Sequence, residues 1–211
     1  YAGKRPYGQW LDEYLVELKD LKIPNVRVPR YTGDDLHRIQ KAFGYSYESV
    51  KTVMLPMAKN GAESTAAMGI DTPLAVLSDD HQPLFNYFKQ LFAQVTNPPI
   101  DSIREKVVTS TTVYLGSDGN VLEEKPENCK QLRINNPILT NTDILKIKNM
   151  KVDGFKVETI PIIYYKNTSL EKAIDHLYVE ADRAHREGAN IIILSDRGVD
   201  YTIRYFRNMM I

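Results

Sequence analysis

The apolar positions of the first sixty residues recur every three or four residues, which is typical of amphipathic helices. This spacing predicts one helix over Trp10–Leu21 and two more within Thr32–Met57. Thr32 and Ser46 are the expected N-caps of that pair, and Gly44 separates the two helices. The face predicted to point inward in the third helix consists of Val50, Val53, Met54 and Met57.

A strongly aromatic helix is predicted in the middle of the chain, between two loops stiffened by proline. Pro73 lies in the loop before it, and Pro98 follows it in a Pro-Pro pair that ends helical geometry. The apolar face of this helix repeats at helical spacing, which predicts a buried stripe. Its members are Leu84, Phe85, Phe88, Leu91, Phe92 and Val95.

After this helix the pattern changes to alternation, which predicts strands. Residues Thr109–Glu123 read as a β-hairpin with Asp118-Gly119 as its turn, and residues 132–134 as a further short strand. Thr140 or Asn141 is then expected to cap a short helix.

The last third of the chain predicts a βαβ unit. Phe155–Tyr165 is rich in β-forming residues, with Pro161 indicating an edge or a break. A capping box at Thr168–Glu171 should begin a helix that Gly188 ends. Ile191–Leu194 is apolar throughout, as required of a parallel strand covered by helices on both faces. The inner stripe predicted for the helix is Leu170, Ala173, Ile174, Leu177, Ala181 and Ala184.

These elements predict an α/β fold with a helical N-terminal part, an aromatic central helix and hairpin, and a C-terminal βαβ unit with parallel strands. At 211 residues the chain can bury a sizeable core. We therefore expect a single domain over residues 1–211, with any subdivision near residues 105–135.

Composition excludes several function classes. Lys+Arg and Asp+Glu balance at 27 each, which argues against a nucleic-acid partner because such a partner requires a basic excess. No apolar run approaches the roughly 20 residues that span a bilayer, so no membrane partner is expected. The only cysteine, Cys129, excludes an internal disulfide and favours a reducing, cytoplasmic compartment. Because the chain opens with Tyr1 and shows no signal-peptide pattern, we expect a piece of a longer protein.

One short motif has candidate chemistry. Ser195, Asp196, Arg197 and Gly198 follow the last predicted strand, at the edge where α/β folds usually bind ligands. The loop could bind a phosphate through its arginine, hydroxyl and free backbone. Alternatively it is a structural clamp, with Asp196 and Arg197 forming an ion pair.

No other motif predicts a reaction. His37 and His81 are too isolated in sequence to suggest a metal site, and no acidic or nucleophilic neighbour lies at a spacing that suggests a triad. Cys129 is flanked by charges of both signs, so a bystander thiol is expected. The phosphate-binding patterns G-x-G-x-x-G and G-x-x-x-x-G-K-[ST] are missing from the sequence. We therefore predict no catalytic residue, no metal ligand and no cofactor-binding residue within this chain.

Several long segments resemble the central domain of the large subunit of glutamate synthase. Near the start, the similarity is carried by Arg5-Pro6-Tyr7 and Trp10-Leu11. In the middle it is carried by Met57–Gly61, Met68–Gly69, Asp71–Ser78, Tyr87–Asp101 and Ile103–Glu105. In the last third it is carried by Asn136–Thr140, Gly154–Val157 and Ile193–Gly198, after which Tyr201–Ile211 departs from the expected continuation.

The resemblance implies a function for a larger protein. Glutamate synthase converts glutamine, 2-oxoglutarate and reductant into two glutamates. Its amidotransferase domain releases ammonia, and its flavin domain carries FMN and an iron–sulfur cluster. The module seen here would be a non-catalytic connector whose partners are those two domains of the same chain. FMN and the cluster are implied for the full-length enzyme, whereas no cofactor is expected here. Whether NADPH, NADH or ferredoxin donates the electrons is not set by this segment.

The same resemblance suggests a role for the proline-stiffened loops. Ammonia is lost to protonation and diffusion unless water is excluded along its route. Asp71-Thr72-Pro73 and Thr96-Asn97-Pro98 bring few mobile side chains, so they are the candidate tunnel or interdomain loops. Two alternatives stay open: an independent α/β protein that binds a flavin or phosphate through Ser195–Gly198, and an assembly module that uses the aromatic helix as an interface.

Overall fold

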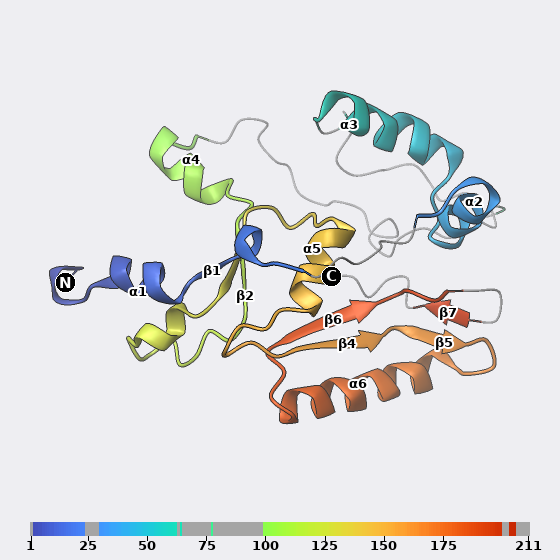
Figure 1. Cartoon of the computed structure of the whole chain (residues 1–211). Helices are drawn as coiled ribbons and strands as arrows, with labels where there is room; N and C mark the ends of the chain where they lie inside the picture. The colour runs from blue at the N-terminus through green and yellow to red at the C-terminus, as the bar shows by residue number, and fades with distance from the viewer. Residues whose placement is uncertain are drawn as a thin grey trace. The chain divides into compact units, whose positions relative to one another are not determined.

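In the computed structural model the chain forms two compact units. Figure 1 labels the helices and strands. The first unit consists of Tyr1–Val28, Pro99–Ile162 and Asn167–Arg197, and the second of Pro29–Pro98, Ile163–Lys166 and Gly198–Ile211. The residues that the structure describes are 2–23, 30–62, 64, 77, 99–199 and 203–205. The predicted aromatic helix and the loops Asp71–Pro73 and Thr96–Pro98 lie outside these residues.

The N-terminal segment of the first unit begins with a 3₁₀ turn, Ala2–Lys4, and helix α1, Tyr7–Tyr14. The predicted helix over Trp10–Leu21 is wrong in its second half. Leu15 is extended, and the next two residues form strand β1, Val16–Glu17, before a 3₁₀ turn at Leu18–Asp20. These residues do have apolar side chains at helical spacing. However, β1 pairs with a strand that is distant in the sequence, and this tertiary pairing overrides the local helical preference.

That distant strand is β3, Leu132–Ile134, the centre of a three-stranded sheet. β1 pairs with it in parallel, with Val16 opposite Leu132. On the other side β2, Val113–Leu115, pairs with it antiparallel, with Tyr114 opposite Arg133. The strand predicted at residues 132–134 is confirmed.

The predicted hairpin within Thr109–Glu123 is wrong in its second strand, because β2 pairs with β3 instead of with the residues after Asp118-Gly119. Gly119 does adopt a left-handed turn conformation, φ +65°. The following residues are held in turns by the Asn128 side chain, which donates to the carbonyl oxygens of Asn120 and Glu123. Side-chain bonds of this kind compete with a strand ladder. A 3₁₀ turn at Pro126–Cys129 completes the connection.

Two short helices flank this sheet in the sequence. Helix α4, Ser102–Val108, is capped by Asp101, whose carboxylate accepts from the backbone N–H of Ile103 and Arg104. Helix α5, Asn141–Lys148, has Thr140 as its N-cap, as predicted.

The core of the unit lies between α5 and the strands, and its buried members are Leu132, Ile134, Ile147 and Ile191.

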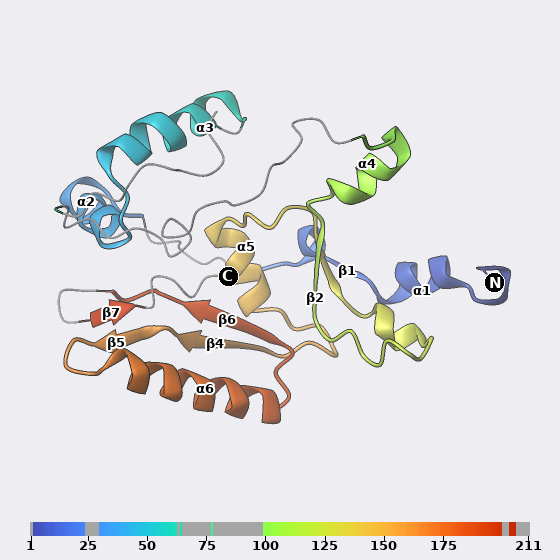
Figure 2. The ribbon, with the colours of Figure 1, turned by 180° about the vertical axis from the view of Figure 1, so that it is seen from behind.

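The βαβ prediction is confirmed. Strands β4, Val157–Pro161, and β6, Ile191–Ser195, pair in parallel, and α6, Leu170–Arg186, connects them. Figures 1 and 2 show α6 running along β4. The strand does break after Pro161, where Ile162 separates β4 from β5.

The ends of α6 show one confirmed and one wrong prediction. Its N-cap is Ser169, whose hydroxyl accepts from the Lys172 N–H, so the expected capping box at Thr168 is displaced by one residue. Gly188 ends the helix at φ +91°, and Ala189 N–H donates to the Ala184 carbonyl, as in a Schellman motif. The buried positions of α6 are Ala173, Leu177 and Ala184, whereas Leu170 from the predicted stripe is exposed.

Strand β6 is apolar on both faces but is not covered on both. Ile191 is 7% exposed and belongs to the core, whereas Ile192 and Leu194 on the opposite face are 38% and 42% exposed. Among the described residues, α6 packs mainly over the neighbouring strand β4. Within the described residues, the predicted helical cover is therefore not found over the face of β6 that carries Ile192 and Leu194.

The cap of α5 provides a pH-dependent prediction. The Thr140 hydroxyl donates to the Asp143 carboxylate at 2.6 Å and accepts from the Asp143 N–H at 3.1 Å. The first of these bonds is the main reason why the pKa of Asp143 lies below its ordinary value. Thr140→Ala should lower the free energy of unfolding by about 1 kcal/mol at neutral pH.

The sign of the pH effect follows from that lowered pKa. A carboxyl group whose pKa falls on folding contributes stability above its ordinary pKa, about 3.9, and loses it as pH falls through the lowered value. The difference between wild type and Thr140→Ala, measured by urea unfolding at pH 7 and pH 3, should shrink at pH 3. Thr140→Ser keeps the hydroxyl and is the matched control. An equal loss at both pH values would contradict the assignment.

The second unit is mainly helical in its described part. Helix α2, Gly33–Ala42, follows Thr32 as predicted, although the Thr32 side chain makes no capping bond. Gly44, at φ +73°, ends this segment. A two-stranded antiparallel ladder of β5, Ile163–Tyr165, and β7, Ile203–Tyr205, also belongs to this unit.

The next helix of this unit starts after Ser46, whose hydroxyl accepts from the Ser49 N–H at 3.1 Å, so the predicted cap is confirmed. It continues as a π-helical stretch, Ser49–Met54, and then as α3, Leu55–Asn60. The π-helical stretch lies just before Pro56. Proline has no N–H to donate and its ring clashes with the preceding turn of an ordinary α-helix, so a wider helical turn at this point relieves the clash. The predicted inward face is wrong at Val53, Met54 and Met57, which are exposed.

Candidate functional site

The candidate loop Ser195–Gly198 begins at the carboxyl end of β6, as predicted from the sequence. Its first residue is still part of the sheet, because the Ser195 carbonyl accepts from the Ile162 N–H at 2.9 Å. Ile162 is among the most deeply buried side chains of the chain. The backbone at the start of the loop is therefore held in place by its hydrogen bond to the buried residue Ile162.

The Arg197 side chain makes a hydrogen bond within the first unit. Its guanidinium donates to the Asn141 side-chain oxygen at 2.6 Å, and its backbone N–H donates to the Ser195 hydroxyl at 3.4 Å. Asn141 is the first residue of α5. The contact that positions Arg197 is thus made with the start of α5, and the ion pairs found among the described residues do not include Asp196 with Arg197.

A mainly aliphatic cavity in the described residues lies elsewhere. Its volume is about 320 Å³, and its lining is mainly aliphatic, with Asn190 and Tyr114 as polar members. The aliphatic lining comes from β2, β6 and the region of α5, including Leu115, Leu139, Ile144, Ile147, Ile191 and Ile193. Ser195, Asp196 and Arg197 line neither this cavity nor the second one.

The second cavity, about 250 Å³, is lined by charged side chains that sequence reasoning missed. Glu17 on β1 and Arg133 on β3 form an ion pair across the parallel ladder. This bond to Glu17 is the main reason why the pKa of Arg133 is raised. The remaining charged lining groups are Lys19, Asp143 and Lys146. In the sequence, Arg133 between two apolar residues indicates a charged side chain on a strand. Its partner Glu17 could not be found in this way, because Glu17 lies within the segment predicted as a helix.

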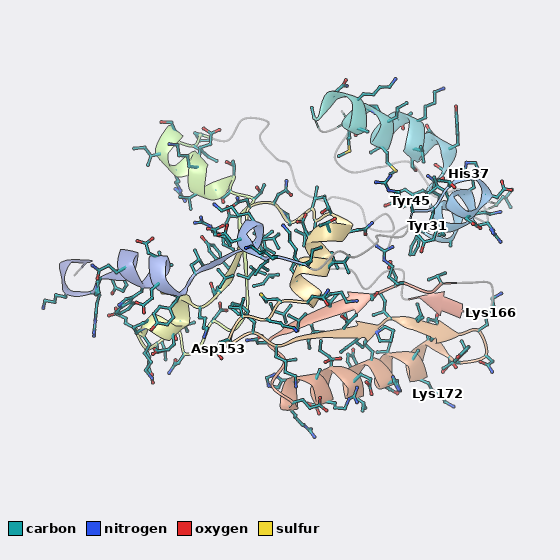
Figure 3. All side chains as sticks on the ribbon, viewed as in Figure 1. Tyr31, His37, Tyr45, Asp153, Lys166 and Lys172 are labelled. Carbon is teal, nitrogen blue, oxygen red and sulfur yellow. The ribbon has the colours of Figure 1, made fainter. Side chains whose placement is uncertain are left out.

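A third set of contacts positions the segment before β4. The Lys130 ammonium lies 2.8 Å from the Asp153 carboxylate, a residue labelled in Figure 3, and this contact lowers the pKa of Asp153. The Asn190 amide donates to the Gly154 carbonyl at 2.7 Å, and its oxygen accepts from the Lys156 N–H at 3.0 Å. The Asn190 bonds join the start of β6 to the start of β4.

Other candidate residues take no part in these groups. His37 lies on the exposed surface of α2 (Figure 3), and His81 lies outside the described residues. Cys129 is a free, partly buried thiol. Within the described ranges, no group of three or more His, Cys, Asp and Glu side chains could hold a metal ion. In the same ranges, no helix combines the length and the apolar character that crossing a membrane requires.

The family model described as "Glutamate synthase central domain" matches residues 38–211. The chain belongs to the glutamate synthase central domain family. The match covers well over half of the sequence, including the βαβ unit and the Ser195–Gly198 loop.

Three similar proteins carry glutamate synthase names. The chain is 41% identical over 196 residues to the "Glutamate synthase [NADPH] large chain" of Bacillus subtilis (strain 168), covering 93% of this chain and 13% of that protein. It is 40% identical over 200 residues to the chloroplastic ferredoxin-dependent glutamate synthase of Spinacia oleracea, covering 93% and 12%. It is 39% identical over 212 residues to the "Glutamate synthase [NADH]" of Schizosaccharomyces pombe (strain 972 / ATCC 24843), covering 94% and 10%. The chain therefore spans about a tenth to an eighth of the length of these relatives.

Proposed function

We propose that this chain is the central module of a glutamate synthase, an enzyme that makes two glutamates from glutamine, 2-oxoglutarate and a reductant. The observation that carries the proposal is the family match over residues 38–211. The names of the relatives support it, because all three are glutamate synthases although their electron donors differ. The proposed partners are an amidotransferase domain and a flavin domain of the same polypeptide, with FMN and an iron–sulfur cluster bound outside this module.

Within such an enzyme the module would act as a connector. It would hold two active sites in a fixed relation and form part of the wall along which ammonia passes. The supporting argument is chemical: free ammonia must be kept from bulk water, and loops with few mobile side chains suit a wall. Asp71–Pro73 and Thr96–Pro98 are the proposed wall loops, on the basis of sequence alone.

The geometry of the Ser195–Gly198 loop favours a structural clamp over a ligand loop. A phosphate would need the Arg197 guanidinium, which is already bonded to Asn141 at 2.6 Å. The clamp would fix the carboxyl end of β6 against the first residue of α5, both within the first unit. This supports the connector proposal over an independent flavin-binding protein.

The wall role is tested in a full-length glutamate synthase that contains this module. Thr72→Trp and Asn97→Trp should break the coupling between glutamine hydrolysis and glutamate formation, because bulky side chains would obstruct the ammonia route. The measurement compares glutamine consumed with glutamate produced, with and without added ammonium. Glu171→Trp, at an exposed position on α6, is the control and should keep the wild-type ratio. Unchanged coupling in both wall variants would overturn the wall role.

The flavin alternative is checked with the purified chain. Its thermal midpoint is expected to stay unchanged with FMN, glutamine, 2-oxoglutarate or glutamate. A ligand at a hundred times its dissociation constant would add about 2.7 kcal/mol of stability, which is easily detected. A raised midpoint with FMN that Arg197→Met abolishes would replace the connector proposal with the flavin-binding one.

A further inference from the structure

The second cavity contains ionisable side chains that are unusually sheltered for a surface hollow. It lies within the first unit, between β1 and the 3₁₀ turn that follows it, the end of β3 and the start of α5. The exposed fractions are 16% for the Glu17 side chain, 21% for Lys146 and 27% for Asp143. Sheltered charges are costly unless each has a partner. The pairing of these groups therefore decides what the cavity can hold.

Both carboxylates of the cavity are already used. Glu17 pairs with the Arg133 guanidinium across the parallel ladder. Asp143 accepts from the Thr140 hydroxyl at 2.6 Å and from the Thr140 N–H at 3.1 Å. Both Thr140 bonds are made to one oxygen of Asp143, Oδ2, and the other oxygen, Oδ1, is the one nearest to the Lys146 ammonium.

Among the described residues, two cationic side chains of this cavity have sheltered N–H groups without a hydrogen-bond acceptor: the Lys146 ammonium and the buried Arg133 Nε. The Lys146 ammonium lies 3.8 Å from the nearest Asp143 oxygen, which is beyond hydrogen-bonding distance. An ammonium has three N–H donors and no acceptor. A sheltered ammonium of this kind favours an incoming anion.

The other polar lining groups also favour an anion. Lys19 adds an exposed ammonium. The Asn136 side-chain oxygen accepts from the Ile138 N–H, so what this side chain can still offer is its amide N–H groups. Among the charged residues around the cavity, three are cationic and two are anionic, which leaves one positive charge.

We propose that this cavity binds a single carboxylate group, with the Lys146 ammonium as its ion-pair partner and the Asn136 amide and Lys19 as further donors. A carboxylate carries one negative charge and neutralises the one excess positive charge, whereas a phosphate group carries about −1.5 to −2 at neutral pH. The carboxylate belongs either to a free acid or to an aspartate or glutamate side chain of another polypeptide segment. The inference is independent of the proposed connector function.

The test is an NMR titration of the ¹⁵N-labelled chain at constant ionic strength, with chloride as the replaced anion. The probes are acetate, free glutamate and a blocked tripeptide, acetyl-Ala-Glu-Ala-amide, which presents only a side-chain carboxylate. We expect saturable shifts at the backbone amides of Ile134–Asn136 and Asp143–Lys146, which line or border the cavity. Binding of the tripeptide and of free glutamate alike indicates a side-chain socket, and binding of free glutamate alone indicates a metabolite site.

Variants separate specific binding from general charge effects. Lys146→Gln keeps most of the aliphatic stem and removes the charge, so the apparent Kd should rise about tenfold or more, the equivalent of one charge-assisted hydrogen bond. Lys19→Gln, at an exposed position, should give a smaller rise and keeps the test valid if Lys146→Gln folds poorly. Lys148→Gln is the matched control, since Lys148 lies on α5 but does not line the cavity. Shifts that do not saturate, or that are equal in Lys146→Gln and wild type, would overturn the proposal.

Discussion

Leu132→Ala is expected to lower the free energy of unfolding by about 2–5 kcal/mol, the usual range for truncating a fully buried leucine. Leu132 has 0% exposure and lies on the central strand of the three-stranded sheet. It pairs with Val16 on one side and Leu115 on the other. Removing its side chain would leave a cavity between both neighbouring strands and α5, in a core with few other fully buried residues.

Urea unfolding followed by circular dichroism measures this effect. Val121→Ala is the control, because Val121 is 81% exposed and a change there should stay within about 0.5 kcal/mol of wild type. If Leu132→Ala were as mild as the control, the core could not be centred on β3. The position of β3 in the sheet would then need revision.

Asn190→Ala is expected to cost about 1–3 kcal/mol, because it removes two hydrogen bonds of about 0.5–1.5 kcal/mol each. The Asn190 oxygen accepts from the Lys156 N–H, and its amide donates to the Gly154 carbonyl. The Asn190 backbone N–H also donates to the Lys156 carbonyl, so this residue fixes the start of β6 beside the start of β4.

The matched variant is Asn190→Asp, which keeps the acceptor for Lys156 but loses the donor to Gly154. It should cost roughly half as much as Asn190→Ala at neutral pH. Hydrogen exchange gives a second measurement, since the Lys156 amide should exchange faster in Asn190→Ala than in Asn190→Asp. Equal exchange in the two variants would show that the side-chain oxygen does not protect this amide.

Local signals predicted the features that depend on neighbouring residues. Thr140, Ser46, Gly44 and Gly188 have the conformations or bonds expected of caps, because capping is decided within a few residues. Pro161 broke the strand for an equally local reason, since it has no N–H to donate.

Features that depend on distant partners could not be predicted in this way. The residues on both sides of Val16–Glu17 include apolar side chains at helical spacing, which predicted a helix. Val16–Glu17 is a strand because it pairs with β3. The charged cavity is a consequence of the same pairing, because Glu17 meets Arg133 only in the folded chain. For the Ser195–Gly198 loop, the sequence predicted its place at the end of a strand, whereas Asn141 as the partner of Arg197 depends on the packing of α5.

The pairing of β1 with β3 also sets an order of events during synthesis. Val16 leaves the ribosome long before its partner Leu132, and the entire segment Pro29–Pro98 of the other unit is made in between. At about 5–20 residues per second, on the order of ten seconds pass before β1 can pair. During that interval the apolar face of β1 has no sheet to join. The first unit therefore completes its fold late and over a long sequence separation, which is the topology that folds slowly.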